Sequence, residues 1–384
     1  MIYLDNAATS FPKPPQVIEE MARCMREYGG NPGRGSHKLA LAAAEKIYDC
    51  RVALSDFFHA DAPENVVFSQ NTTHALNIAI LSLARKGAHF ICSDMEHNSV
   101  RRPLEYLARE RGCSYSVFDS YVRDPDRNAQ KICSSISSLL RPETVAVIST
   151  ACPNVCSARM PLDEIGALCR RLGIFFIVDG AQGAGHFPID IKRSNISALA
   201  LPGHKGLLGP QGSGALILSN DFKSHPLLYG GSGSASLDPD MPSELPERLE
   251  AGTHSTPAIV GLEAGIRLIN EIGLEKISSH EKILCSKAIR MLSEIQGVTV
   301  YAPRHAGSVV SFNIGSISSD KAASLLSERE ICVRGGFHCN PMAHSVLGSD
   351  THGSIRASFS PFNTADDVYV LAKEVLAVAR GKYR

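Results

Sequence analysis

The first half of the chain alternates short apolar runs with longer segments of helical periodicity. The run VVF at 66–68 precedes THALNIAILSLA, in which Leu76, Ile80 and Leu83 fall on one helical face. The same alternation continues through HFICSDME, RRPLEYLARERG, SYSVFD, VAVIST, PLDEIGALCRRLG and IFFIVD. Repeated strand–helix–strand units predict an α/β fold with a mostly parallel sheet covered by helices on both faces.

The pattern changes after residues 230–258, a stretch rich in Gly, Ser and Pro that indicates a long surface loop. Helical periodicity resumes at AIVGLEAGIRLINEIG, and then come VVSFNIG, KAASLLSER, ICVRGG, IRASFS and DDVYVLAKEVLAVA. This order predicts a smaller α+β domain. We expect a large α/β domain at 14–257 and a small domain at 258–384, with residues 1–13 packing against the small domain.

Composition narrows the class of protein. The 384 residues suit about two domains of ~150 residues. Lys+Arg and Asp+Glu both number 39, so the net charge of zero argues against nucleic acid or an anionic membrane as the main partner. The opening MIYLDNAATSFPKPPQ lacks the basic and apolar regions of a signal peptide. No run approaches the ~18 apolar residues that span a bilayer. Eleven cysteines without a secretory signal favour reduced thiols and a cytoplasmic location.

Lys205 stands out by its surroundings. It follows the apolar run at 198–201, which is typical of a buried strand, and it is flanked by Gly203, Gly206 and further glycines. Burial disfavours the charged form of a lysine and makes its amine nucleophilic. The glycines allow the backbone to approach a ligand or a neighbouring subunit closely.

Polar residues follow other predicted strands at their carboxyl ends, where open α/β sheets bind ligands. They are Asp179, His97, Asn154 and the pair Thr72–Thr73. Each one alone is a weak signal, which an ordinary turn residue, helix cap or satisfied polar side chain explains at least as well. Together they describe a carboxylate for a ring nitrogen, an imidazole for ring stacking, an amide for a ring substituent and a helix start for a phosphate. With Lys205 they predict pyridoxal 5′-phosphate (PLP) held as a Schiff base.

At this point the chain resembles a known family. The motifs YLDNAATS, NTTHALN, MEHNSV, PNVCSARMPLDEI, VDGAQ, GHKGLLGPQG, EAGTHST, VRGGFHC and IRASFSPFN occur in this order along nearly the whole chain. The set is similar to the class V aminotransferase group of fold-type I PLP enzymes, and most similar to the cysteine desulfurases and selenocysteine lyases. The resemblance implies the PLP-dependent transferase fold.

The resemblance also implies residue roles. Lys205 would bind PLP covalently, Asp179 would pair with the ring nitrogen, Gln182 with the ring hydroxyl, and His97 would stack on the ring. The phosphate would be held by Thr72, Thr73 and His204, and by Thr253 from the neighbouring subunit of a homodimer. The substrate side would be formed by Arg356, which grips the carboxylate, by Asn154, which also contacts the cofactor, and by His37.

Cys339 distinguishes the activity. It lies in RGGFHCNPMAH, a loop between two predicted strands, where the neighbouring His338 is expected to lower the pKa of the thiol. In desulfurases the cysteine at this place becomes a persulfide. A metal site made by His338, Cys339 and His344 is a competing interpretation, disfavoured because no second ligand pair accompanies it.

The leading hypothesis is a cysteine desulfurase that converts L-cysteine to L-alanine and passes sulfur through a Cys339 persulfide to an acceptor protein. A selenocysteine lyase or another β-lyase or aminotransferase of the group is the first alternative, and a weakly catalytic PLP-binding sulfur-relay partner is the second. Two departures bear on this. Pro202 stands where many desulfurases place a phosphate-binding serine, and the loop reads FHCNPMAH instead of HHCA.

Overall fold

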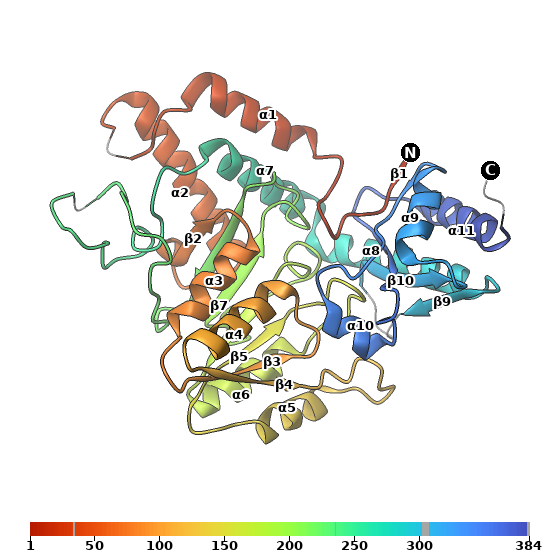
Figure 1. Ribbon diagram of the computed structural model, residues 1–384. Helices are drawn as coiled ribbons and strands as arrows, with labels where there is room; N and C mark the ends of the chain where they lie inside the picture. The colour runs from red at the N-terminus through yellow and green to blue at the C-terminus, as the bar shows by residue number, and fades with distance from the viewer. Residues whose placement is uncertain (34, 235, 302–306, 382–384) are drawn as a thin grey trace.

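A seven-stranded sheet forms the centre of the larger part of the molecule (Figure 1). The computed structural model describes all residues except 34, 235, 302–306 and 382–384. The strand order is β2-β8-β7-β6-β5-β3-β4, and only β8 runs antiparallel to its neighbours. The strands are β2 (Val66–Ser69), β3 (His89–Ser93), β4 (Ser114–Phe118), β5 (Thr144–Thr150), β6 (Phe175–Asp179), β7 (Ala198–Pro202) and β8 (Gly214–Leu218). The predicted mostly parallel sheet is confirmed.

Helices cover both faces of this sheet because its strands are apolar on both sides. Along β7, Ala198 and Ala200 pack on one face, whereas Leu199 and Leu201 pack on the other. The first face is covered by α3 (Thr72–Ser82) and α4 (Asn98–Glu110). The second face is covered by α2 (Lys38–Phe58), α5 (Ala129–Ser138), α6 (Leu162–Leu172) and α7 (Thr256–Ile272), and α1 (Pro15–Arg23) packs on α7.

A smaller antiparallel sheet organises the C-terminal part, with strand order β12-β10-β9. Its strands are β9 (Val298–Tyr301), β10 (Val309–Ile314) and β12 (Ile355–Ser358). The helices of this part are α8 (Leu274–Ser293), α9 (Ser319–Ser327), α10 (Pro341–Leu347) and α11 (Ala365–Ala379). No helix in the described ranges is long and apolar enough to cross a membrane.

The strand predicted at ICVRGG is shorter than expected. Only β11 (Ile331–Cys332) is a strand, and it pairs in parallel with β1 (Ile2–Tyr3) instead of joining the three-stranded sheet. The chain then makes an isolated bridge from Arg334 to Arg356 of β12, and the exposed Arg334 side chain forms an ion pair with Asp5. The N-terminal segment is therefore held against the small part, and Leu4 belongs to its core.

The domain boundary at 257–258 stays a prediction, and the packing favours a later one. Ile259, Leu262 and Ile277 share the core of the large sheet, whereas Leu284 and the residues after it pack in the core of the small part. The long helix α8 thus begins against one core and ends against the other.

Candidate active site

A cavity opens at the carboxyl ends of β5, β6 and β7, next to the first turns of α3 and α4. Eight residues predicted from the sequence line it: Thr72, Thr73, His97, Asn154, Asp179, Gln182, His204 and Lys205. The remaining lining residues are Asn71, Met95, Ser99, Thr150, Cys152 and Ala181. Strands far apart in the sequence meet at this edge because parallel strands place their carboxyl ends together.

Lys205 lies just beyond the end of β7 and lines the cavity. Burial lowers the pKa of its ammonium group to about 8, although the nearby Asp179 carboxylate opposes the shift. The flanking glycines pack closely within this chain, and their approach to a ligand or a neighbouring subunit stays a prediction. A Cβ on Gly203 would collide with the side chain of Ser213, and a Cβ on Gly206 would collide with the carbonyl of Ala184. These contacts fix the turn that presents Lys205.

Asp179 and Gln182 lie on the floor of the cavity. The Asp179 carboxylate accepts a hydrogen bond of 2.9 Å from the Ala181 N–H, and burial raises its pKa. Gln182 donates through Nε2 to the carbonyl of Ala7 at 2.8 Å. Its Oε1 is buried and has no hydrogen-bond partner among the described residues. Ala7 thus orients the amide so that its oxygen remains available.

His97 is held at the start of α4. Its Nδ1 accepts from the Ser99 N–H at 3.1 Å, which leaves Nε2 to carry the ring proton. Burial, together with Lys205, lowers the pKa of the imidazole to about 4, so the ring is neutral. Ser99 Oγ lies 2.9 Å from His97 Nδ1 and 2.8 Å from Thr73 Oγ1. The sequence analysis missed Ser99, whose only signal is its place in the first turn after His97.

The start of α3 forms one end of the cavity. Asn71 caps this helix by accepting from His74 N at 2.9 Å, so Thr72 and Thr73 lie in the first turn, whereas we expected a cap there as well. Free N–H groups at a helix start attract a phosphate. His204 lines the same cavity with a buried Nδ1 that has no partner in the described chain. Pro202 is buried as the last residue of β7 and does not line the cavity.

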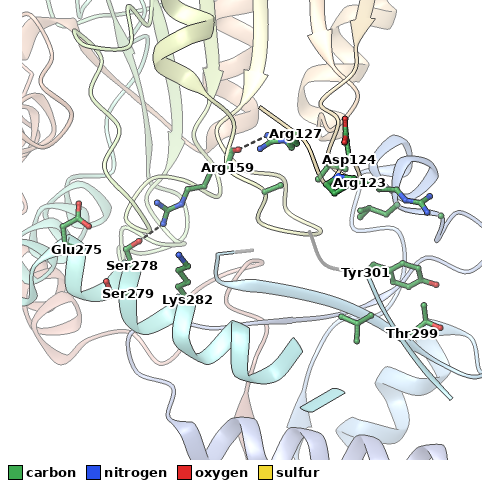
Figure 2. A pocket seen from close by; sticks show the side chains of 16 residues that line it. Arg123, Asp124, Arg127, Arg159, Glu275, Ser278, Ser279, Lys282, Thr299 and Tyr301 are labelled. Atoms are coloured by element: carbon green, nitrogen blue, oxygen red, sulfur yellow. Dashed lines mark hydrogen bonds between the residues drawn. The ribbon is translucent and has the colours of Figure 1, made fainter. Parts of the chain in front are cut away.

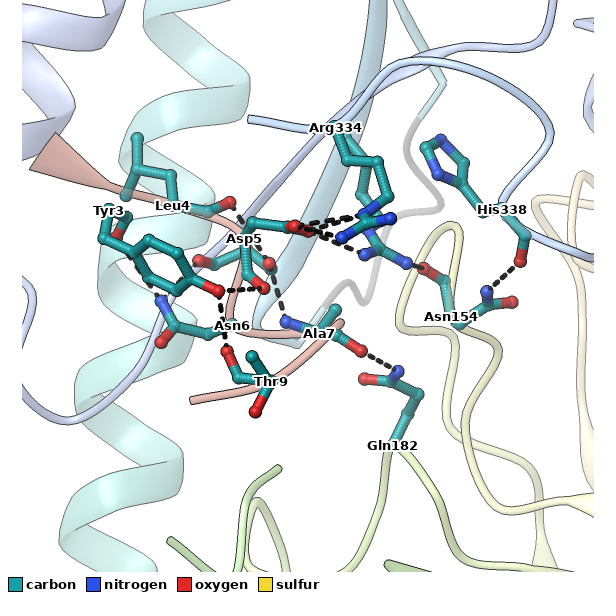
Figure 3. Close-up of polar contacts among 12 residues, drawn as sticks. Tyr3, Leu4, Asp5, Asn6, Ala7, Thr9, Asn154, Gln182, Arg334 and His338 are labelled. Carbon is teal, nitrogen blue, oxygen red and sulfur yellow. Dashed lines mark hydrogen bonds and ion pairs between the residues drawn. The ribbon is translucent and has the colours of Figure 1, made fainter. Parts of the chain in front are cut away.

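Figure 3 shows the polar contacts around Asp5, whose carboxylate pairs with Arg356 of β12, a residue outside the cavity lining. Arg356 Nη2 is 2.9 Å from Asp5 Oδ1, and its Nη1 donates to the Asn154 carbonyl at 3.3 Å. Asp5 Oδ2 also pairs with Arg334 Nη2 at 2.7 Å. The sequence analysis quoted Asp5 only within a motif and gave it no role. The shared carboxylate holds both guanidinium groups, while Arg356 Nε stays buried and unpartnered in the described residues.

The loop that carries Cys339 is tied to the rim of the cavity. The Cys339 carbonyl accepts from the Asn98 N–H at 2.8 Å, and the His338 carbonyl accepts from Asn154 Nδ2 at 2.7 Å. Asn340 completes the link through its Nδ2, which donates to Asn154 Oδ1 at 3.0 Å. His338 and Cys339 have φ of 50° and 56°, a backbone conformation that costs free energy in residues other than glycine. The Cys339 side chain is exposed.

His338 does not act on the thiol as the sequence suggested. Its ring is buried, Nε2 lies 2.9 Å from the Ser354 carbonyl, and burial lowers the pKa of the imidazole to about 2. A neutral ring supplies no positive charge. A cation within electrostatic reach of Cys339 is Arg334, whose pKa is raised by Asp5 and also by Cys339. In the described ranges no three His, Cys, Asp or Glu side chains cluster in a way that could hold a metal ion.

Two predicted residues lie away from the cavity of their own chain. His37 is exposed and caps α2, accepting from Ala40 N at 3.3 Å. Thr253 is exposed in the long loop, and it lines a different hollow together with Gly33 and Tyr229. This chain alone does not bring either residue to the site.

The cavity fits PLP by its own chemistry. It offers a lysine amine of lowered pKa and a buried carboxylate. It also offers two polar atoms without a partner among the described residues, Gln182 Oε1 and His204 Nδ1, beside the start of α3. These groups match a carbonyl carbon, a ring nitrogen, a ring hydroxyl and a phosphate. A parallel sheet presenting this set at its carboxyl edge defines the class of fold-type I PLP-dependent enzymes.

Comparison with known proteins gives the family. Residues 2–371 match the family model described as aminotransferase class-V. The chain belongs to this family, whose members are PLP-dependent enzymes. The fold and the family predicted from the sequence are thereby confirmed.

Within this family, the chain is similar to proteins named cysteine desulfurases. A probable cysteine desulfurase of Methanothermobacter thermautotrophicus is 34% identical over 98% of this chain and 94% of its own length. The apo structure of a cysteine desulfurase from Thermococcus onnurineus superposes with a TM-score of 0.90 at 31% identity, covering 99% of this chain and 95% of that one. The Escherichia coli cysteine desulfurase CsdA, in an S-sulfonic acid form, gives a TM-score of 0.88 at 26% identity, covering 99% and 94%.

Proposed function

We propose that this protein is a PLP-dependent cysteine desulfurase. One observation carries the proposal: the exposed Cys339 sits on a loop whose carbonyls are held by Asn98 and Asn154, at the rim of the cavity that contains Lys205. A thiol placed there can meet the sulfur of a cysteine bound in the cavity. It can also face solvent, where a sulfur acceptor would approach.

Arg356, Lys205 and Asp179 have different roles in the proposed reaction. Arg356 binds the substrate carboxylate through the fork that now contacts Asp5. Lys205 would hold the cofactor covalently, and its amine is the base that would accept the proton from the substrate Cα. When bound, PLP supplies an electron sink for that carbon. Asp179, buried at the end of β6, is placed to keep the ring nitrogen protonated.

Cys339 then takes the sulfur. Its thiolate forms a new S–S bond to the substrate sulfur as the Cβ–S bond breaks, and Cβ receives a proton. The sum is L-cysteine plus a Cys339 thiol giving L-alanine plus a Cys339 persulfide. An external thiol reduces the persulfide to sulfide and restores Cys339. The acceptor protein in the cell stays a prediction.

The test is an assay of both products. We expect the holoenzyme, given L-cysteine and dithiothreitol, to release alanine and sulfide in equal amounts over many turnovers. Alanine is measured by chromatography and sulfide by a colorimetric assay on the same samples. Protein reduced with borohydride before the assay is the control. Pyruvate and ammonia in place of alanine would contradict the proposal, because they indicate β-elimination instead of sulfur transfer.

We also propose that the enzyme is a homodimer in which Thr253 completes the partner's phosphate site. Large apolar side chains are exposed on α2 and on the long loop beside it: Leu39, Leu41, Leu228, Tyr229 and Leu237. Figure 1 shows these segments together on the side of the molecule away from the small part. Thr253 lies in the same loop. It does not line the Lys205 cavity of its own chain.

Mixed dimers test this arrangement. We expect sedimentation at twice the chain mass of 41.3 kDa. A dimer of one Thr253→Ala subunit and one Lys205→Ala subunit should keep one intact site, and hence about half the activity, because the Lys205→Ala subunit supplies the missing threonine. If Thr253 acted within its own chain, this dimer would retain only about half the activity of the Thr253→Ala homodimer, because its single site with Lys205 would lack the threonine. Loss of a hydrogen bond to a phosphate weakens binding by roughly 10- to 100-fold.

The predicted cytoplasmic location stays a prediction. All eleven cysteines are free thiols, which suits a reducing compartment.

A further inference from the structure

A second, larger cavity lies between the two parts of the molecule, on residues the active site does not use (Figure 2). Its volume is about 780 Å³. One wall is the segment after β4 and the loop at 158–159, and the other is the start of α8 with β9. The end of α10 closes one side. We call this cavity the interdomain groove.

Positive charge is concentrated in the interdomain groove of a chain whose net charge is zero. Four cations line it: Arg123, Arg127, Arg159 and Lys282. Within the described ranges, none of them has a carboxylate at ion-pairing distance. Of the two acidic residues in the lining, Asp124 is paired with Lys131 at 2.7 Å, which leaves Glu275. The groove therefore carries an unbalanced positive charge.

Two of the arginines are held in place by neutral groups. Arg159 donates to Ser278 Oγ at 2.6 Å, and its guanidinium lies 4.3 Å from the centre of the Phe187 ring. Arg127 donates to the carbonyls of Ser120 and Arg159, each at 2.9 Å. Burial lowers the pKa of Arg127, because the carbonyl oxygens around its guanidinium group do not fully replace the lost hydration. These contacts pre-organise the guanidinium groups and reduce the entropy lost when a ligand binds.

The cations face the groove from opposite walls. Arg127 and Arg159 come from the large part, whereas Lys282 comes from α8, and Figure 2 shows Arg159 and Lys282 facing the same space. A single small anion can contact the cations of one wall only. A ligand with two or more anionic groups can contact the cations of both walls. Cavities of ~300–1,000 Å³ at domain interfaces are typical small-molecule sites, and the guanidinium fork matches phosphoryl and carboxylate groups.

We propose that the interdomain groove is a binding site for a small polyanion that carries at least two phosphoryl or carboxylate groups. The proposal does not depend on the desulfurase activity, because the groove shares no lining residue with the cavity of Lys205.

Isothermal titration calorimetry of the holoenzyme at low ionic strength, with inorganic pyrophosphate and with citrate, tests this site. The holoenzyme is used because the cofactor phosphate then occupies the start of α3. We expect saturable binding of one anion per chain. Preference for pyrophosphate identifies a phosphorylated ligand, and preference for citrate identifies a polycarboxylate. Absence of saturable binding of both anions overturns the proposal.

Variants locate the binding. Lys282→Ala and Arg159→Gln should each weaken binding by about tenfold or more, as expected for one charge-assisted contact. Lys276→Ala is the matched control, because Lys276 is exposed on the same helix outside the groove. It should bind as the wild type does. Equal losses in Lys276→Ala and Lys282→Ala overturn the proposal, since the anion would then respond to overall charge. Thermal unfolding without anion shows whether Arg159→Gln is folded.

Discussion

The Cys339→Ala variant should bind the cofactor normally and yet form alanine from L-cysteine more than about a thousandfold more slowly than the wild type. The expected loss is that of an enzyme deprived of its nucleophile, whereas the cavity itself is unchanged. Cys339 does not line the cofactor cavity, and its backbone contact to Asn98 does not involve the side chain. The yellow absorption of the bound cofactor and the alanine output of the same sample are the two measurements.

Cys133→Ala is a suitable control, because Cys133 is a partly exposed thiol on α5, remote from the cavity lining. It should form alanine as the wild type does. Undiminished alanine formation by Cys339→Ala would rule out the persulfide role. If that variant also released selenide from selenocysteine at the wild-type rate, the selenocysteine lyase alternative would be favoured.

The large sheet could be predicted from the sequence because the apolar pattern along β7 and its neighbours matches the burial of these strands on both faces. The ALAL run alternates between two cores, as a strand covered on both faces must. The pattern failed at β11, where two residues of strand remain and the partner is the N-terminus. No periodicity within 331–336 reveals a partner more than 300 residues away. The Asp5–Arg334 ion pair joins the same two distant segments and likewise exists only in the folded chain.

The same distinction separates the predicted and missed parts of the site. Residues that act at the end of their own strand, such as Asp179 and Lys205, could be predicted because strand ends converge. The role of His338 could not, since sequence proximity to Cys339 does not tell which way its ring points. The ring turns inward to the Ser354 carbonyl and is neutral. Asp5 was missed for the related reason that its partners, Arg334 and Arg356, lie at the other end of the chain.

Replacement of Lys205 should have the largest effect of any substitution in the chain. In Lys205→Ala we expect no covalent cofactor and a fall in alanine formation of at least about a thousandfold, since general acid–base catalysis alone contributes roughly 10²–10⁴. Lys205→Arg should be equally inactive, because it restores the positive charge but not a nucleophilic amine. Absorbance spectra and alanine assays of both variants provide the measurement.

A second lysine makes the assignment to Lys205 testable. Burial lowers the pKa of Lys13 to about 8, as it does for Lys205, so in the cofactor-free protein both amines become neutral as the pH rises through that value. Cofactor uptake should therefore accelerate between about pH 7 and pH 9 whichever lysine reacts. The two differ in geometry: Lys13 donates to Ser10 Oγ and the His204 carbonyl and does not line the cavity. After borohydride reduction, peptide mapping should find the pyridoxyl group on Lys205, and Lys13→Ala should retain it. A label on Lys13 would show that burial, without placement at the strand end, determines which amine reacts.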